Sequence, residues 1–275
     1  MIKYLIFCFS LFIIFISCDE KPVDIPEFSV PDTGKTVLIE ELTGVSCPNC
    51  PAGSARLQSL IQLFEGSVIG VSVHGDFLSD PVTASEFDFR NEEGVKLEEY
   101  LSPWFGKPCA TFNRIQVENA SEFAISNIGL WQQIVEEELA KPQSIEIQLN
   151  TQFDESTREM SVSAGIIPLE NIDGDIRISV MLTESHIIDA QLNQSEVILD
   201  YEHNHVLRKM ITSFDGDVLS SGLIEDNILN ASYSFVLPEE QGWWIPENME
   251  VIVFISKVTE NSKEILQASS AHIIE

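Results

Sequence analysis

The chain has 275 residues, of which 15 are Lys or Arg and 44 are Asp or Glu, so its formal net charge is −29 at pH 7. So acidic a surface repels nucleic-acid phosphates and anionic lipid headgroups, which need clustered basic residues, and we expect no nucleic-acid partner. A hydrophobic content of 44% with 16 Phe and 4 Trp excludes a chain that is disordered throughout. The length permits one large domain or two ordinary ones.

Residues 1–17 predict an export signal, because Lys3 is followed by an almost unbroken apolar run. The 14 residues from Tyr4 to Ser17 are too few for a membrane-spanning helix, which needs roughly 20. The run ends at Ile16-Ser17-Cys18, which resembles the bacterial lipobox and implies cleavage before Cys18 and lipidation of that cysteine. A plain cleaved signal and an uncleaved anchor are the alternatives.

Residues 18–34 are polar and rich in proline, which is typical of a tether between a membrane and a folded body. The acidic residues directly behind Cys18 resemble the export tags of surface lipoproteins in Bacteroidetes-type bacteria. Removal of residues 1–17 takes away Lys3 and no acid, so the mature charge is −29 − 1 = −30. We therefore expect an outer membrane lipoprotein that faces the periplasm or the cell surface and contacts the membrane through the lipid on Cys18.

The pair Cys47-Pro48-Asn49-Cys50 has C-x-x-C spacing and lies between a predicted strand at residues 36–42 and a predicted helix at residues 51–64. Such spacing fits either a redox disulfide or half of a zinc site. A zinc site needs further ligands, and the N-terminal half offers only His74 and Cys109, so the redox disulfide is favoured and no metal is expected. A helix N-terminus lowers the pKa of a nearby thiol, which predicts that Cys47 is the attacking sulfur.

Strand, C-x-x-C, helix and a second apolar strand at residues 67–73 together resemble the thioredoxin fold. The resemblance implies a cis-proline facing the disulfide, for which Pro108 is the candidate. It also implies a buried acid beneath the active site, for which Glu41 is the candidate. The alternative for Glu41 is a position at the solvent-exposed end of the strand, because burial of an unpaired carboxylate is costly.

Two features depart from the thioredoxin pattern. Ser46 stands where thioredoxins have Trp, and the 57 residues between Cys50 and Pro108 leave room for an inserted helical segment, expected at residues 84–101. Cys109 is a further thiol beside Pro108. It could trap or resolve a mixed disulfide, or it could be a buried small hydrophobe without a partner.

A helical pattern at residues 129–140 closes the first half, and the periodicity then changes to two. Alternating segments at residues 144–150, 160–164, 175–182, 231–237, 250–256 and 265–274 predict an antiparallel sandwich. The expected fold is therefore an α/β thioredoxin-like domain at residues 35–142 followed by an all-β antiparallel sandwich domain at residues 143–275. Residues 201–211 interrupt the alternation. There, His203 and His205 are either two metal ligands or part of a hydrogen-bonded corner, and the corner is favoured.

Segments along nearly the whole mature chain resemble the outer membrane protein 28 family of Bacteroidetes lipoproteins. They are residues 37–51, Asn113-Arg114, residues 203–208 and residues 253–256 with 266–268. The resemblance implies a thioredoxin-like domain followed by a β-sandwich and says little about activity.

Two functions remain open from the sequence. The first is a thiol-disulfide oxidoreductase that acts on protein thiols or disulfides without a cofactor, in which Cys47 attacks, Cys50 resolves, Pro108 shapes the groove and Glu41 moves the proton. The second is a surface binding or adhesion lipoprotein in which Cys47 and Cys50 form a static disulfide and the sandwich recognises protein or glycan.

Overall fold

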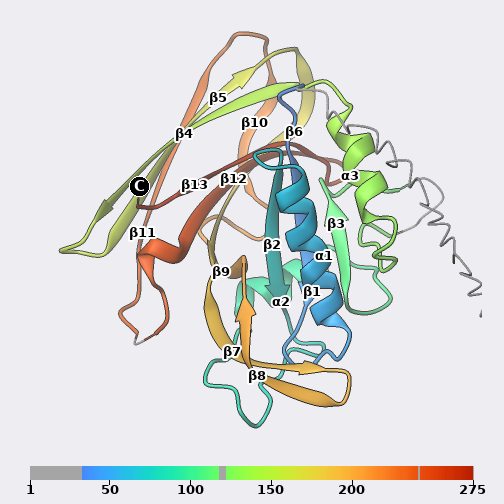
Figure 1. Ribbon diagram of the computed structural model, residues 1–275. Helices are drawn as coiled ribbons and strands as arrows, with labels where there is room; N and C mark the ends of the chain where they lie inside the picture. The colour runs from blue at the N-terminus through green and yellow to red at the C-terminus, as the bar shows by residue number, and fades with distance from the viewer. Residues whose placement is uncertain (1–32, 118–121, 241, 275) are drawn as a thin grey trace, which may run out of the picture.

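The computed structural model describes residues 33–117, 122–240 and 242–274. The N-terminal part contains strands β1 (Val37–Thr43), β2 (Val68–His74) and β3 (Cys109–Phe112) and helices α1 (Cys50–Leu63), α2 (Glu92–Tyr100) and α3 (Trp131–Leu139). β1 pairs with β2 in parallel and with β3 in antiparallel orientation. α1 and α3 cover one face of these strands and α2 lies on the other (Figure 1).

The inserted helix is shorter than the sequence predicts. The segment from residue 84 to residue 91 is not helical, and α2 begins at Glu92, where the side chain of Asn91 caps the helix by accepting a hydrogen bond from the amide of Gly94. Asn91 and not the acidic residues before it therefore sets the start of the helix. The expected helix at residues 129–140 is present as α3, and the helix expected at residues 51–64 is present as α1.

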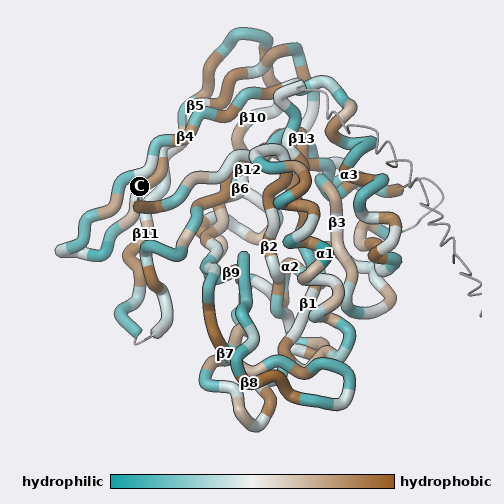
Figure 2. Tube along the Cα trace, viewed as in Figure 1, coloured by the Kyte–Doolittle hydropathy of each residue, from teal (hydrophilic) through white to brown (hydrophobic). Residues whose placement is uncertain are grey.

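The second half consists of strands β4 (Ile145–Asp154), β5 (Glu159–Pro168), β6 (Ile172–Glu184), β7 (Ile187–Asn193), β8 (Glu196–His203), β9 (Val206–Met210), β10 (Asp217–Leu223), β11 (Leu229–Val236), β12 (Met249–Val258) and β13 (Ile265–His272). A short 3-10 helix at Pro246–Asn248 precedes β12. The six segments predicted from period-two alternation are confirmed as β4, β5, β6, β11, β12 and β13. Figure 2 shows hydrophobic and hydrophilic residues alternating along β4 and β5, as expected for strands with one buried face.

One mixed sheet crosses the domain boundary predicted at residue 142. Its strand order is β13-β12-β6-β9-β2-β1-β3, and β10 pairs with the edge of β6. In this sheet the pairing that joins the halves is short, because β2 and β9 share a single register pair, Ser72 with Val206. There the amide of Ser72 donates a hydrogen bond of 2.7 Å to the carbonyl of His205. The C-terminal strands thus extend the N-terminal sheet, where the sequence predicts a separate sandwich that follows it.

A second, three-stranded antiparallel sheet, β11-β5-β4, packs against the C-terminal part of the large sheet. Apolar side chains from β4 and β5 meet those from β6 and β12 in one buried cluster. The protein is therefore mostly β, with one mixed and one antiparallel sheet in contact. The remaining strands, β7 and β8, form a two-stranded hairpin by themselves, at the end of the molecule where α1 begins (Figure 1).

Within the described ranges, none of the helices is both long and apolar enough to span a bilayer. The predicted signal at residues 1–17, the lipidation site Cys18 and most of the tether lie outside those ranges.

Candidate active site

Cys47 and Cys50 form a disulfide at the start of α1, with their Cα atoms 5.4 Å apart. Cys50 is the first residue of the helix, and Pro51 follows at a position where its missing N–H costs nothing. The first turn contains no acidic residue, so the partial positive charge of the helix end is not neutralised there. Both cysteines are buried, with exposed fractions of 0% for Cys47 and 1% for Cys50.

Glu41 is fully buried on the face of β1 that packs against α1. Its two carboxyl oxygens each accept a hydrogen bond of 3.1 Å from the hydroxyl of Ser54, and Ser72 approaches at 3.5 Å. Burial raises the pKa of Glu41 to about 8, although the hydroxyls of Ser54 and Ser72 oppose the rise. Of the two positions considered from the sequence, the structure has the buried one. At neutral pH this carboxyl group therefore holds its proton.

Pro108 precedes β3 and follows a cis peptide bond with Lys107. α1 approaches it closely, because a Cβ placed on Gly53 would lie 2.5 Å from the Cβ of Pro108 and 2.8 Å from Oε1 of Glu41. Glycine at position 53 thus lets the first turns of the helix contact both the proline and the buried acid. The three predicted site elements, the cysteine pair, Glu41 and Pro108, come together around the start of α1.

A buried ion pair lies beside Pro108. The ammonium of Lys107 pairs with the carboxylate of Glu98 from α2, and it also donates a hydrogen bond of 3.1 Å to the hydroxyl of Ser79. Burial lowers the pKa of Lys107 and raises that of Glu98, and the attraction between the two opposes both shifts. The sequence offered no pattern that singles out this pair, because its members come from the inserted segment and the loop before β3.

Cys109 is a free thiol with no exposed surface. It packs in an apolar cluster with Leu42, Leu97 and Leu101, on the α2 side of β1. Burial raises the pKa of Cys109 to about 12, so the reactive thiolate is scarce at neutral pH. These observations favour the interpretation as a buried small hydrophobe over that of a resolving thiol.

The β7–β8 hairpin lies across the C-x-x-C loop, which the sequence did not predict. The amide of Leu192 donates a hydrogen bond of 2.9 Å to the carbonyl of Val45, and the amide of Gln194 donates one of 2.9 Å to the carbonyl of Pro48. The side-chain amide of Gln191 lies 3.2 Å from the carbonyl oxygens of both Gly44 and Cys47 and donates to them. The hairpin therefore contributes to the burial of the disulfide.

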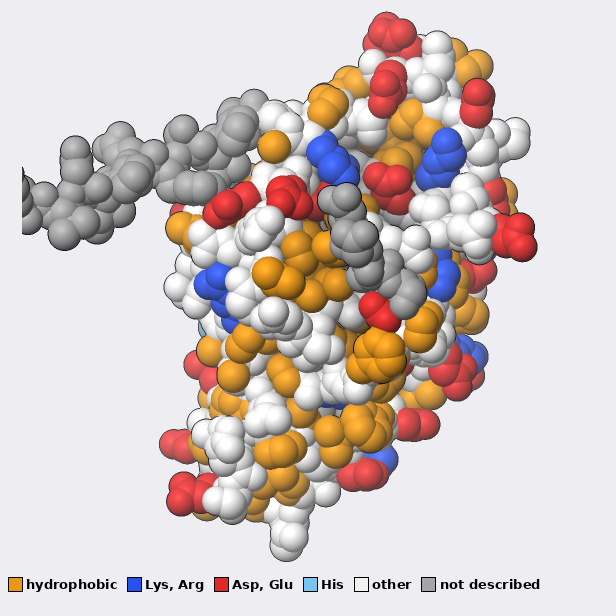
Figure 3. Space-filling view, turned by 90° about the vertical axis from the view of Figure 1, so that its right-hand side faces the viewer, with side chains coloured by type: hydrophobic (Ala, Val, Ile, Leu, Met, Phe, Trp, Pro, Cys, Tyr) orange, Lys and Arg blue, Asp and Glu red, His pale blue; other side chains and the backbone are white. Residues whose placement is uncertain are grey.

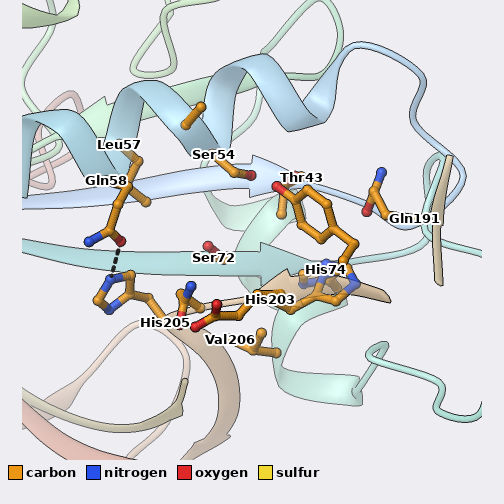
Figure 4. A pocket seen from close by; sticks show the side chains of 14 residues that line it. Thr43, Ser54, Leu57, Gln58, Ser72, His74, Gln191, His203, His205 and Val206 are labelled. Carbon is orange, nitrogen blue, oxygen red and sulfur yellow. Dashed lines mark hydrogen bonds between the residues drawn. The ribbon is translucent and has the colours of Figure 1, made fainter. Parts of the chain in front are cut away.

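A pocket of about 290 Å³ lies between α1, the end of β2 and the β8–β9 connection (Figure 4). Ser54 and Ser72 line it, together with Tyr201 and the three imidazoles His74, His203 and His205. His205 Nε2 lies 3.3 Å from Oε1 of Gln58 on α1. Since Ser54 and Ser72 also contact Glu41, the pocket connects the outside of the molecule with the buried acid through hydroxyl groups.

Burial keeps the three pocket histidines in their neutral form. Burial lowers the pKa of His203 and of His205 to about 4, and that of His74 well below its ordinary value. In the part of the chain that the structure describes, no group of three or more His, Cys, Asp and Glu side chains is arranged to hold a metal ion. His205 forms the turn between β8 and β9, and its amide donates a hydrogen bond of 3.0 Å to the hydroxyl of Ser185, which agrees with the predicted corner.

The remaining family-like motifs hold the fold together. Asn113 exchanges hydrogen bonds with the backbone of Leu38 on β1, and Arg114 forms a buried bidentate pair with Glu40. The guanidinium of Arg208 lies over the ring of Trp243 at 3.3 Å from its centroid and beside the carboxylate of Glu184. Neither motif reaches the disulfide.

Comparison with solved structures shows the fold. HBP35 of Porphyromonas gingivalis superposes with a TM-score of 0.68 at 13% sequence identity, over 87% of this chain and 75% of that one. Protein AGR_C_4864 from Agrobacterium tumefaciens superposes with a TM-score of 0.53, also at 13% identity, over 87% of this chain and 95% of that one. At such low identity these similarities concern the fold alone. Comparison with curated protein sequences gave no significant match.

The sequence profile of the family described as "Outer membrane protein Omp28" matches residues 101–275, which is more than half of the chain. The matched region includes Pro108 and the β7–β8 hairpin but begins after Cys47 and Cys50. Membership therefore bears on location and on the larger part of the fold, while the cysteine pair has to be judged on its own chemistry. On this match, the chain belongs to the Omp28 family of outer membrane proteins.

Proposed function

We propose that this protein is a thioredoxin-like thiol-disulfide oxidoreductase of the outer membrane, anchored through a lipid on Cys18 and acting on protein thiols or disulfides. The observation that carries the proposal is the arrangement at the start of α1. A disulfide lies at the start of the helix, and a neutral buried Glu41 and Pro108 pack against Gly53 in the next turn. An isolated structural disulfide has no need of a buried acid beneath it, since that acid is costly to bury.

The chemistry follows from the oxidised form. A substrate thiolate attacks the sulfur of Cys47, the Cys47–Cys50 bond breaks, and a bond between Cys47 and the substrate forms. The leaving thiolate of Cys50 takes up a proton, which Glu41 can supply because it is protonated at neutral pH. A second substrate thiolate then attacks the substrate sulfur of the mixed disulfide. The substrate becomes oxidised to a disulfide and the cysteine pair is reduced to two thiols.

The reverse sequence reduces a substrate disulfide, with Cys47 as the nucleophile and Cys50 as the resolving thiol. In that direction Cys50 gives up a proton, which the carboxylate of Glu41 accepts. Both directions use the same groups, and the compartment's redox partners decide between them. Neither direction requires a cofactor.

The test is an insulin-reduction and dithiol-oxidation assay with the full-length chain. We expect Cys47→Ala to abolish both activities, because it removes the attacking sulfur. Cys109→Ala is the matched control and should retain activity, because Cys109 is buried on the other side of β1. A Cys47→Ala variant that is as active as the parent would contradict the proposal.

The second candidate is a binding or adhesion lipoprotein with a static disulfide. The specific observation in its favour is that neither cysteine exposes its surface, with fractions of 0% and 1%. The reduction potential of the pair distinguishes the two functions. A value below about −300 mV is typical of structural disulfides, whereas exchange catalysts lie at roughly −270 to −120 mV.

A further inference from the structure

The β7–β8 hairpin is the part of the molecule that closes off the disulfide. It belongs to neither large sheet, and its strands pair only with each other among the described residues. Its contacts with the C-x-x-C loop are made by the segment 191–194, through two backbone amides and the side chain of Gln191. A further weak contact joins Gln194 Nε2 to Oδ1 of Asn49 at 3.3 Å.

This closed arrangement is incompatible with thiol exchange. An incoming sulfur has to reach the sulfur of Cys47, and Cys47 exposes 0% of its surface. The hydrogen bonds of segment 191–194 are made to the carbonyls of Gly44, Val45, Cys47 and Pro48, so the segment follows the loop that carries the reactive sulfur. Any substrate that reaches Cys47 must occupy some of this space.

The contacts are of a kind that another polypeptide can reproduce. The amides of Leu192 and Gln194 are two residues apart and donate to Val45 and Pro48. Main-chain hydrogen bonds of this sort do not depend on side-chain identity, and extended peptides use them when they add to an exposed backbone edge. A free extended segment carrying a cysteine can therefore replace the hairpin segment at the same carbonyls.

Two sharp bends mark the ends of the hairpin. His186 before β7 and His205 after β8 both have positive φ angles, of 59° and 56°, so the chain bends sharply at both ends of the hairpin. Its outer face leaves Ile188, Val197 and Leu199 exposed by 53%, 41% and 68%. Besides the C-x-x-C loop, the carboxylate of Asp189 holds it to the amides of Glu86 and Phe87, and the ring of His203 packs against that of Phe89.

The surface around the C-x-x-C loop favours an apolar polypeptide in place of segment 191–194. Phe77 and Phe105, from the loops after β2 and before β3, are exposed by 50% and 85%. In the view of Figure 3 apolar side chains gather in the lower part of the molecule, which is the end that carries the hairpin, and acidic side chains lie at its edges. A segment with apolar residues gains buried area there, whereas an acidic one is repelled.

We propose that segment 191–194 occupies, in the oxidised protein, the place of an extended cysteine-bearing substrate segment, and that the hairpin swings away before Cys47 reacts. The substrate class rests on the proposed function; the covering of the disulfide does not. In the exchange step the substrate sulfur bonds to Cys47 and is oxidised, the Cys47–Cys50 bond breaks, and Cys50 leaves as a thiolate that takes up a proton.

The variant Gln191→Glu tests whether segment 191–194 shields the disulfide, a shielding that we call the cover. It keeps the size of the side chain but replaces the donating amide with a carboxylate, which repels the carbonyls of Gly44 and Cys47. Asn193→Asp is the matched control, because it adds the same charge to the hairpin at a side chain for which the described contacts include no bond to the C-x-x-C loop. The measurement is the rate at which a water-soluble phosphine reduces the disulfide of the full-length chain, followed by thiol labelling. The phosphine becomes its oxide with oxygen from water, and it reduces accessible disulfides whatever their potential.

We expect Gln191→Glu to react about 10-fold faster than the parent, which corresponds to the loss of roughly 1.4 kcal/mol of hydrogen bonding. The control should stay within about 2-fold. An unchanged rate for Gln191→Glu overturns the cover. Should that variant not fold, hydrogen exchange of the parent decides instead. Amides of Leu192 and Gln194 that exchange well before those of β12 support the cover, and amides that exchange only with β12 overturn it.

The substrate class has its own readout. In the Gln191→Glu background an extended apolar peptide with one cysteine should form the mixed disulfide at least about 10-fold faster than free cysteine does. Equal rates overturn the substrate class. A faster phosphine reaction in a protein that exchanges with neither thiol contradicts the proposed function and leaves the cover supported, so the two failures are distinguishable.

Discussion

The two faces of strand β1 carry neighbouring glutamates that are equally buried and differently paired. Glu40 lies on the face toward α2, where Arg114 holds it through two hydrogen bonds of 2.9 and 2.6 Å and Thr111 donates a third of 2.8 Å. Glu41 lies on the face toward α1, where the hydroxyl of Ser54 at 3.1 Å and that of Ser72 at 3.5 Å contact it. Burial alone therefore does not decide what a carboxyl group does in this protein.

The difference lies in the partner. A bidentate guanidinium satisfies both oxygens of a carboxylate, so Glu40 ties β1 to the segment after β3 as part of the structure. Hydroxyls give no compensating charge, and burial raises the pKa of Glu41 to about 8, which leaves it protonated and able to exchange a proton near neutral pH. The same strand thus presents a structural acid on one side and a candidate catalytic acid on the other.

The largest effect is expected from Arg114→Met, which leaves Glu40 buried without its cation. Removal of one partner of a buried ion pair costs about 3–5 kcal/mol, because the other charge stays desolvated. Guanidinium chloride unfolding followed by circular dichroism should show this loss in the free energy of unfolding. The double variant Glu40→Gln/Arg114→Met should recover part of it. A loss below about 1 kcal/mol for the single variant would mean that the pair is not structural.

Glu41→Gln, in contrast to Arg114→Met, is expected to increase the stability of the protein. An acid whose pKa is about 8 in the folded state and 4.5 otherwise destabilises the fold as pH rises from about 4.5 to 8, because the unfolded state releases the proton first. Glutamine cannot ionise, so the variant should be more stable than the parent by roughly 2–4 kcal/mol at pH 8 and equal to it near pH 4. The measurement is urea unfolding across this range.

On the proposed mechanism the same Glu41→Gln variant should exchange thiols more slowly, because Cys50 would lose its proton donor and acceptor. A variant that is less stable than the parent at pH 8 would show that Glu41 is held by its contacts as Glu40 is. If the variant is more stable than the parent but exchanges thiols at the same rate, Glu41 takes no part in the proposed exchange reaction. Either outcome would contradict the contrast between a structural Glu40 and a candidate catalytic Glu41.

The histidines of the pocket give a third, smaller test on the side of Glu41. His205 is a base whose pKa burial lowers to about 4 from 6.5, so the folded state stays neutral while the unfolded state takes up a proton. Stability should fall between about pH 6.5 and 4, by at most roughly 3 kcal/mol for this residue. His205→Gln should flatten that part of the profile and leave stability at pH 8 nearly unchanged. An unchanged acid slope in thermal unfolding would exclude His205 as its source.

The sequence identified this centre through local signals. The spacing of Cys47 and Cys50, the strand before them and the helix after them all lie within 30 residues. Pro108 and Glu41 are candidates that the resemblance to the thioredoxin fold implies. No role for Glu40 could be predicted from the sequence, because its partner Arg114 lies 74 residues further along the chain. Alternation along β1 places the two acids on opposite faces, but only tertiary packing decides which face holds the cation.

The β7–β8 hairpin was missed for a related reason. β8 is short of buried apolar positions, since most of its residues are at least partly exposed, so it lacks the alternation that revealed β4 and β5. The join between β2 and β9 rests on a single register pair, which no periodicity reports. Strands with a regular buried face were predictable, whereas the strand pairs that cover the disulfide and connect the two halves were not.

Lys209→Met should have the smallest effect on stability, because it removes an exposed ion pair that can be compared with the buried pair of Glu40 and Arg114. Lys209 on β9 pairs with Glu93 on α2, but both side chains are partly exposed, by 35% and 22%, whereas the Arg114 and Glu40 side chains are exposed by 1% and 0%. Water screens the exposed pair, so its loss should cost at most about 1 kcal/mol, and less in high salt. Urea unfolding at low and at high salt measures both quantities. If Lys209→Met lowers the free energy of unfolding as much as Arg114→Met does, and independently of salt, then burial does not explain the large contribution of the Glu40–Arg114 pair to stability.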